Sequence, residues 1–308
     1  MSEAEKIKKV AVVSGKGGVG KTSIAAAIAS ILAERGRPLI AVDCDVDAPN
    51  LALMFAMQTP DMQDIPVQAT EKARFIEANC THCKACIDDA YCNFDALSWN
   101  DERSEPQVDP FACEGCGSCN TLCKAGAFAI DQVESGHIYT ARTKEGFLLV
   151  YGETIIGAST SGKLVRSVKE HALSNADGAR FAIIDGPPGI GCPVIATISD
   201  IDYVVVVMEP FPTAFHDASR MIEVIKRFKL PFGIVVNRCN AWPEGKKVIM
   251  DFIDSNGYTH LGDIPIDLAI PRSVVNMQSI IMFSPDCIAS RSIRVIYRNL
   301  MEELGLDE

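Results

Sequence analysis

The chain has 308 residues, of which 48% are apolar, and its formal net charge at pH 7 is −11. This length and composition allow a full hydrophobic core, in one large domain or two modest ones. The acidic balance excludes a sequence-independent nucleic-acid binder, which needs a basic face.

The same composition gives expectations about location and about the cysteines. No run of eighteen apolar residues exists, so we expect no membrane span, and we do not expect a membrane partner. The charged N-terminus lacks the apolar core of a signal peptide, which predicts a cytoplasmic protein. In a reducing compartment, the twelve cysteines are better interpreted as metal ligands than as disulfides.

The first predicted elements are a buried strand at residues 10–13 and a helix at residues 24–29, joined by a glycine-rich loop. Residues 15–22 read GKGGVGKT and match the phosphate-binding pattern G-x-x-x-x-G-K-[ST]. Between a strand and a helix, this pattern favours a phosphate-binding loop over a plain glycine-rich turn. The backbone N–H groups of such a loop converge on a triphosphate at the helix N-terminus. Lys21 is expected to reach the β- and γ-phosphates of ATP, and Thr22 to hold Mg²⁺. The expected nucleotide-binding residues here are Gly15, Gly17, Gly18, Val19, Gly20, Lys21, Thr22 and Ser23.

The next apolar run, residues 39–42, predicts a second strand that ends in Asp43, Cys44 and Asp45. Carboxylates at the C-terminal end of a strand lie at the ligand-binding edge of an open parallel sheet. Asp43 is therefore a candidate nucleotide-site residue.

Eight cysteines then fall into two groups. The second group, Cys113, Cys116, Cys119 and Cys123, has the bacterial ferredoxin spacing for a [4Fe–4S] cluster. The first group, Cys80, Cys83, Cys86 and Cys92, has five residues before its last cysteine instead of three. Thiolates suit iron because they are soft, strongly donating ligands.

In two-cluster ferredoxins, the fourth cysteine of each group binds the other cluster. Cys92 would then join Cys113, Cys116 and Cys119, and Cys123 would join the first group. Structural zinc is the alternative for paired Cys-x₂-Cys motifs, but two triplets and two single cysteines fit two cubanes better. Residues 76–131 carry ten acidic and three basic side chains. This acidic excess indicates either a solvated surface or an electrostatic field that steers a basic partner toward the segment.

Further apolar runs at residues 181–184, 203–208 and 232–236 predict buried parallel strands. Asp185 follows the first of them and is the expected Walker-B carboxylate for Mg²⁺. Together these signals predict an α/β fold with a doubly wound, mostly parallel sheet and an inserted two-cluster ferredoxin-like α+β domain. We expect the ATPase to occupy residues 1–72 and 133–308, and the insertion residues 73–132.

These motifs resemble those of the MinD/Mrp/ParA group of ATPases with a deviant Walker-A loop, in the branch that has an inserted ferredoxin domain. The motifs that carry the resemblance are residues 15–22, 43–45, 161–165, 185–189, 209–217 and 235–238, and it covers nearly the whole chain.

The resemblance implies specific roles. Lys16 would be the signature lysine that reaches nucleotide phosphates across a dimer interface, and Lys21 would complete the catalytic loop. Asp45 would position or activate the attacking water, Asp43 would support Mg²⁺ or the switch region, and Asn237 would contact adenine. ATP would close a homodimer, or a heterodimer with a paralogue, and hydrolysis would return ADP.

The remaining cysteines (Cys44, Cys192, Cys239 and Cys287) are expected to be small buried residues. Residues 291–301 form an amphipathic pattern that predicts a packed C-terminal helix rather than a membrane-binding one. Two functions remain open. One is an ATPase that controls an iron–sulfur module, for electron transfer to a partner metalloprotein or for its maturation. The other is a MinD-like or ParA-like positioning or scaffold switch with structural metal.

Overall fold

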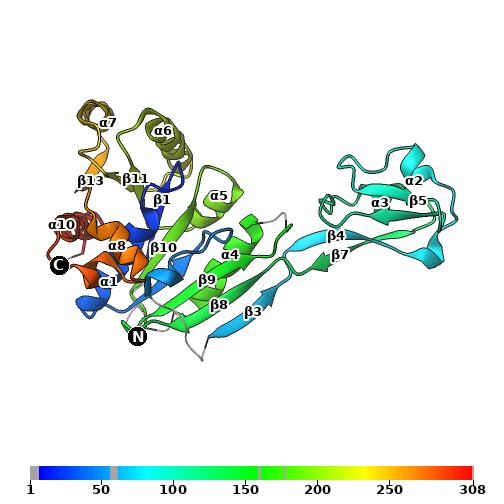
Figure 1. Ribbon diagram of the computed structural model, residues 1–308, viewed down its shortest axis with the longest axis horizontal. Helices are drawn as coiled ribbons and strands as arrows, with labels where there is room; N and C mark the ends of the chain where they lie inside the picture. The colour runs from blue at the N-terminus through cyan, green and yellow to red at the C-terminus, as the bar shows by residue number, and fades with distance from the viewer. Residues whose placement is uncertain (1–6, 56–61, 159–160, 177, 307–308) are drawn as a thin grey trace. The chain divides into compact units, whose positions relative to one another are not determined.

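The computed structural model describes residues 7–55, 62–158, 161–176 and 178–306 (Figure 1). The chain forms two compact units. The first comprises residues 1–65, 138–153 and 165–308, and the second comprises residues 66–137 and 154–164. The insertion expected at residues 73–132 lies within the second unit.

The first unit is built on a nine-stranded sheet in the order β13-β12-β11-β1-β10-β2-β9-β8-β3 (Figure 1). The seven strands from β13 to β9 are parallel, which confirms the predicted α/β fold with a mostly parallel sheet. The strands are β1 (Lys8–Ser14), β2 (Leu39–Asp43), β3 (Gln63–Val67), β8 (Gly136–Arg142), β9 (Leu148–Thr154), β10 (Phe181–Pro188), β11 (Tyr203–Met208), β12 (Phe232–Asn237) and β13 (Thr259–Ile264).

Helices cover this sheet because its central strands are apolar on both faces. In β1, for example, Val10, Ala11, Val12 and Val13 are all fully buried. The helices are α1 (Lys21–Glu34), α4 (Ser161–Ser174), α5 (Cys192–Ile198), α6 (Pro212–Arg227), α7 (Pro243–Asn256), α8 (Ala269–Val275), α9 (Ile280–Phe283) and α10 (Ile288–Glu303), with a 3₁₀ turn, η1 (Ala52–Phe55).

The C-terminal helix α10 packs into the core, as the sequence predicts. Ile293, Ile296, Tyr297, Leu300 and Met301 are at most 1% exposed and belong to one cluster with α1 and the sheet. Within the described residues, no helix has the length and apolar character needed to cross a membrane.

The second unit is small and built from two antiparallel strand pairs, β4 (Thr70–Phe75) with β7 (Phe128–Val133) and β5 (Leu97–Asn100) with β6 (Glu105–Val108). The short helices α2 (Ala85–Asp88) and α3 (Ser118–Leu122) and a 3₁₀ turn, η2 (Glu77–Asn79), complete it. Its buried centre contains Cys86, Cys119 and Phe128.

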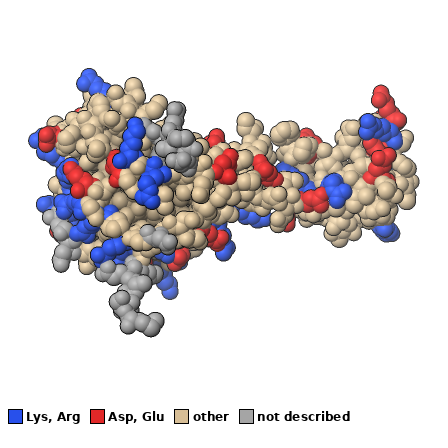
Figure 2. Space-filling model, turned by 90° about the horizontal axis from the view of Figure 1, so that it is seen from below, with Lys and Arg blue, Asp and Glu red and all other residues tan. Residues whose placement is uncertain are grey.

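On the molecular face in Figure 2, acidic side chains are interspersed with Lys and Arg and form no single large patch.

Candidate nucleotide site and cysteine cavities

The glycine-rich loop of residues 15–22 joins β1 to α1, which begins at Lys21. Gly20 caps the helix with φ of 94° and Gly18 has φ of 78°, a left-handed conformation that favours glycine. Lys21 is 6% exposed, so its ammonium group lies inside the site rather than in solvent. The sequence thus builds the predicted strand–loop–helix geometry.

Gly15 has a different reason to be glycine. A Cβ atom at this position would lie 2.1 Å from the carbonyl carbon of Asp217, in the second turn of α6. The loop therefore packs directly on the backbone of α6, and any larger residue must push the two apart.

Asn237, at the end of β12, braces the same loop. Its side-chain amide donates a hydrogen bond to the carbonyl oxygen of Val19 at 2.8 Å. Its side-chain oxygen accepts one from the N–H of Arg238 at 2.9 Å. Asn237 also lines the nucleotide cavity, and its contact with adenine stays a prediction.

Two neighbouring strands bring the predicted carboxylates together, since Asp185 in β10 pairs in register with Asp43 in β2. Asp43 is fully buried and accepts hydrogen bonds from the N–H groups of Asp45 at 2.9 Å and Leu51 at 2.8 Å. Burial, and then the neighbouring charge of Asp185, hold the pKa of Asp43 well above its ordinary value.

Asp185 is buried without a matching donor. Within the described part of the chain, neither of its carboxylate oxygens has a hydrogen-bond partner. Burial raises the pKa of Asp185 to about 7, although Lys21 and the Thr22 hydroxyl oppose the rise. An orphaned carboxylate beside a threonine hydroxyl is the donor set of a hard cation such as Mg²⁺.

These loops border a cavity of about 1020 Å³. Its polar side is formed by the phosphate-binding loop with Asp45, Asp47 and Asn237. Its apolar lining comes from Leu53 and from the apolar residues of the segment that contains α8, which are Ile264, Pro265, Ile266, Leu268, Ile270, Pro271, Val274 and Val275. The cavity is large enough for a nucleotide, and its lining combines charged and apolar groups.

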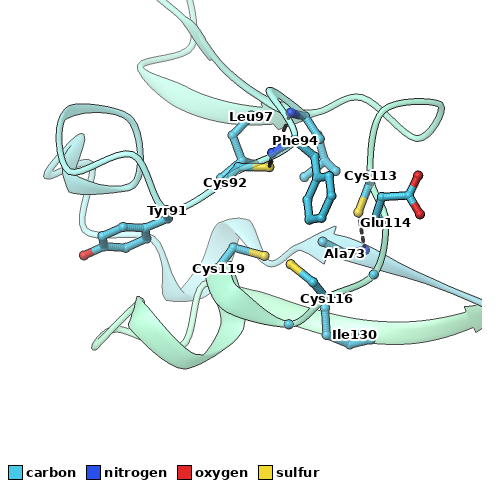
Figure 3. Close-up of a pocket in the computed structure, with 14 residues that line it drawn as sticks. Ala73, Tyr91, Cys92, Phe94, Leu97, Cys113, Glu114, Cys116, Cys119 and Ile130 are labelled. Atoms are coloured by element: carbon cyan, nitrogen blue, oxygen red, sulfur yellow. Dashed lines mark hydrogen bonds between the residues drawn. The ribbon is translucent and has the colours of Figure 1, made fainter.

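In the second unit, the eight cysteines line two cavities, and each cavity draws on both sequence groups. Cys92 shares the first cavity with Cys113, Cys116 and Cys119, and all four sulfur atoms point into it (Figure 3). Cys123 shares the second cavity, of about 460 Å³, with Cys80, Cys83 and Cys86. The structure therefore exchanges the last cysteine of each group, despite the longer spacing before Cys92.

Backbone N–H groups point at several of these sulfurs. Ala73 donates to Cys113 Sγ at 3.3 Å (Figure 3). Phe94 and Ala96 donate to Cys92 Sγ, each at 3.4 Å. In the other cavity, Ala127 donates to Cys123 Sγ and His82 to Cys80 Sγ, also at 3.4 Å. Such donors stabilise sulfur atoms that carry negative charge.

The CobQ/CobB/MinD/ParA nucleotide binding domain family matches residues 10–280. The chain belongs to this family.

Two similar proteins and one similar solved structure show the extent of the likeness. An uncharacterized protein of Methanocaldococcus jannaschii is 34% identical over 296 residues, which cover 96% of this chain and 97% of that protein. An iron–sulfur cluster carrier protein of Pyrococcus furiosus is 24% identical over 312 residues, which cover 96% and 86%. The septum site-determining protein MinD from Pyrococcus horikoshii, complexed with Mg-ADP, superimposes with a TM-score of 0.58 at 18% identity, over 97% and 98% of the two chains; this likeness shows the fold.

Lys16, the second residue of the phosphate-binding loop, is exposed and does not line the nucleotide cavity. Burial raises the pKa of the buried Glu209, while the charges of Arg238 and Lys16 act to lower it. Glu209 also forms an ion pair with Arg238, with 2.5 Å between Oε1 and Nη1. Sequence reasoning missed this pair, whose members follow the ends of two neighbouring strands.

The other cysteines are not all alike. Cys44 and Cys239 are buried, as predicted, and Cys287 is partly buried. The prediction is wrong for Cys192, which is exposed at the first position of α5. Among the described residues, no group of three or more His, Cys, Asp or Glu side chains is arranged to hold a single metal ion.

Proposed function

We propose that this protein is a Mg²⁺-dependent ATPase that carries two [4Fe–4S] clusters, and that an ATP-driven dimer switch controls the cluster-bearing unit. The observation that carries the proposal is the arrangement of the cysteines, with four around each of two cavities and one member exchanged between the sequence groups.

The cysteine cavities fit iron–sulfur clusters in donor type and donor number. Four thiolates are the usual ligand set of a cubane. Cys92, Cys113, Cys116 and Cys119 would hold one cluster, and Cys80, Cys83, Cys86 and Cys123 the other. Bound clusters would supply one-electron chemistry. The N–H groups of Ala73, Phe94 and Ala96 would stabilise the anionic sulfurs of the first site.

The nucleotide cavity fits Mg²⁺ and ATP. Lys21 and the N–H groups of the loop would bind the phosphates, and Thr22 and Asp185 would hold the cation. Asp45 lines the cavity and would orient the attacking water. Burial raises the pKa of Asp45, while Lys21 lowers it. The apolar wall from α8 would cover the base.

The dimer switch rests on Lys16. Its side chain is exposed and outside its own nucleotide cavity, so it is available to a nucleotide bound by a second copy. Its nearby counter-charge in the single chain is Glu209, which Arg238 also holds. Closing the dimer would therefore give Lys16 phosphate oxygens as direct partners.

Two uses of the clusters follow, and they differ in whether clusters leave the protein. Complete ligation by four cysteines favours clusters that stay bound and pass electrons to a partner metalloprotein. The relatives named iron–sulfur cluster carrier proteins favour delivery of clusters in its maturation. We propose electron transfer, because no cysteine pair of the Cys-x₂-Cys type exists outside residues 80–123 to form a more labile site.

Anaerobic protein loaded with iron and sulfide tests this choice. It is mixed with an apo-ferredoxin acceptor, with and without Mg-ATP, and its iron is then measured after separation. Electron transfer predicts reversible reduction by dithionite with all iron retained. ATP-dependent movement of iron to the acceptor would replace electron transfer by cluster delivery.

The positioning switch finds less support. Its membrane form needs an apolar helix face. Most apolar residues of α10 are buried in the core, and Ile288 and Val295 are its only exposed large apolar residues. Sedimentation with lipid vesicles in ATP and in ADP should show no nucleotide-dependent binding.

A further inference from the structure

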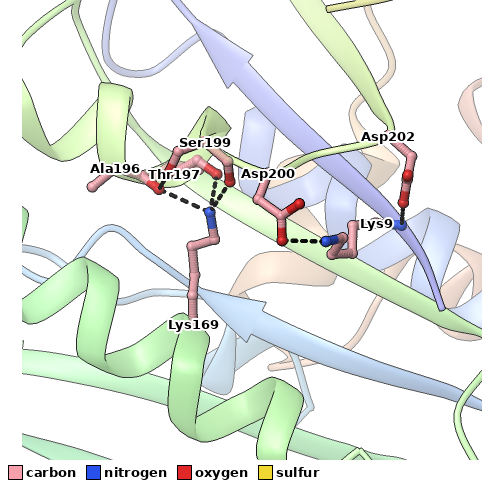
Figure 4. A network of polar contacts seen from close by, with 7 residues as sticks. All are labelled: Lys9, Lys169, Ala196, Thr197, Ser199, Asp200 and Asp202. Atoms are coloured by element: carbon pink, nitrogen blue, oxygen red, sulfur yellow. Dashed lines mark hydrogen bonds and ion pairs between the residues drawn. The ribbon is translucent and has the colours of Figure 1, made fainter. Parts of the chain in front are cut away.

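Lys169 is a buried lysine whose ammonium group is fully engaged by another helix. It lies on α4, is 7% exposed, and donates to the carbonyl oxygens of Ala196 at 2.8 Å, Thr197 at 2.7 Å and Ser199 at 2.6 Å (Figure 4). An ammonium group has three protons, so these bonds use its whole donor capacity.

These three carbonyls lie at the C-terminal end of α5. The last carbonyls of a helix lack partners within the helix and carry a partial negative charge, which a cation satisfies. Lys169 therefore caps α5 from outside. Burial lowers the pKa of Lys169, and the nearby Cys44 and Asp200 oppose this effect.

A second lysine fixes the turn that follows α5. Lys9, in β1, forms an ion pair with Asp200 at 2.5 Å, and its backbone N–H donates to Asp202 at 2.8 Å (Figure 4). Because β1 leads directly into the phosphate-binding loop, the end of α5 is tied both to that loop's strand and to α4.

The N-terminal end of α5 follows closely after Asp185, the proposed magnesium ligand. β10, which contains Asp185, ends at Pro188, and α5 begins at Cys192. Between them, the N–H of Gly189 donates to the carbonyl oxygen of Ser14 at 3.2 Å, and Pro188 lines the nucleotide cavity. A shift of this short segment on nucleotide binding must move α5 or strain its connection.

The course of the chain gives α4 a second importance. Residues 154–164 belong to the second unit, the cysteine-bearing unit. Residues from Val165 onward belong to the first unit, the ATPase unit. α4 spans this boundary, and Val165, Val168 and Ala172 anchor it in the ATPase unit with no exposed surface. Rigid helices are among the elements that carry coupling between distant sites when they have two discrete arrangements.

We propose that Lys169 is a positioning residue that ties α5, and with it the segment after Asp185, to α4, so that nucleotide state at the ATPase site alters the cysteine-bearing unit. This inference rests on the proposed function. It adds the residue through which the two activities are linked.

The test uses full-length, cluster-loaded protein and three variants. Lys169→Met keeps the length of the side chain but removes all three donors, Lys169→Arg restores donors, and Arg166→Ala changes an exposed residue of the same helix. The readouts are iron content, kcat and KM for ATP, and the EPR spectrum of the reduced clusters with and without Mg-ATP.

We expect the wild-type spectrum to change with Mg-ATP, and this change to be lost in Lys169→Met but kept in Lys169→Arg and Arg166→Ala. In Lys169→Met, kcat should fall about tenfold while KM changes less than about twofold, as for a residue that acts on the reaction rather than on binding. An ATP-dependent spectral change that persists in Lys169→Met would overturn the inference.

Hydrogen exchange on the wild-type protein keeps the inference testable if Lys169→Met fails to fold. Mg-ATP should change amide protection in residues 165–174 and 192–199 together. A change in the second segment without the first would also overturn it. A wild-type protein that lacks iron or ATP turnover would instead refute the proposed function, so the two failures are distinguishable.

Discussion

Cys92 and Cys113 line the same cavity, although Cys92 ends the first cysteine group and Cys113 begins the second. The antiparallel pairing of β4 with β7 helps to bring the two groups together. Cys113, of the second group, lies against β4, where its Sγ accepts a hydrogen bond from the N–H of Ala73. The cysteine-bearing unit therefore couples its two sites, because neither sequence group fills a cavity alone.

This exchange predicts the outcome of paired substitutions. Cys92→Ala with Cys116→Ala removes two ligands from one cavity, so about four iron atoms should remain per chain. Cys92→Ala with Cys83→Ala removes one ligand from each cavity, so iron should fall toward zero. Both are measured by iron analysis on anaerobically purified protein. The opposite ranking would mean that each sequence group holds its own cluster.

Lys21→Ala should reduce ATP hydrolysis by at least about 10²-fold, because it removes a cation from the developing phosphate charge. The iron content should not change, since Lys21 and the eight cysteines of residues 80–123 belong to different units. Phosphate release and iron analysis on one preparation provide both numbers. Loss of iron in this variant would point to misfolding instead.

Lys16→Ala should also abolish hydrolysis, and in addition it should prevent the ATP-dependent dimer. Sedimentation velocity with a non-hydrolysable ATP analogue measures the dimer directly. Lys247→Ala, an exposed lysine on α7, serves as the charge-matched control. Wild-type turnover in the Lys16 variant would refute its action across the dimer.

Asp185→Asn tests the magnesium site through stability. At pH 8, above the pKa of about 7, the buried carboxylate is ionised and destabilises the metal-free fold. The neutral amide should therefore raise the Tm of the metal-free protein by about 2–4 °C. It should also lose the stabilisation that Mg-ADP gives the wild type. Thermal unfolding with and without Mg-ADP checks both, with the exposed Asp254→Asn as control.

Two glycines of the phosphate-binding loop should respond differently to alanine. At Gly15 the added Cβ meets the backbone of Asp217, whereas at Gly17 its nearest neighbour is Pro188 at 3.9 Å. Gly15→Ala should therefore lower the free energy of unfolding by about 2 kcal/mol or more, and Gly17→Ala by much less. Urea denaturation compares them, and equal losses would contradict the packing of the loop on α6.

Local patterns in the sequence predict much of the fold. The apolar runs at residues 10–13, 39–42 and 203–208 become central strands because a doubly covered sheet needs such runs. The glycine loop and Asp185 also lie where a parallel sheet must put them. These features depend on residues close in sequence or on the common edge of parallel strands.

Contacts between distant segments escape such reasoning. Lys169 and the end of α5 meet only after both helices pack on the sheet, and no pattern marks that lysine in advance. The apolar wall of the nucleotide cavity, formed partly by Leu268 and Val275, likewise comes from segments with no local motif. The exposure of Cys192 also follows from tertiary packing, since it depends on how the first turn of α5 lies against the sheet.

Iron and acid-labile sulfide analysis with EPR, on anaerobically purified protein with and without Mg-ATP, tests the central claim most directly. The account predicts about eight iron and eight sulfide atoms per chain, and a reduced-cluster signal that changes when Mg-ATP is added. Zinc in place of iron, or a full complement of clusters whose signal is indifferent to Mg-ATP, would contradict it.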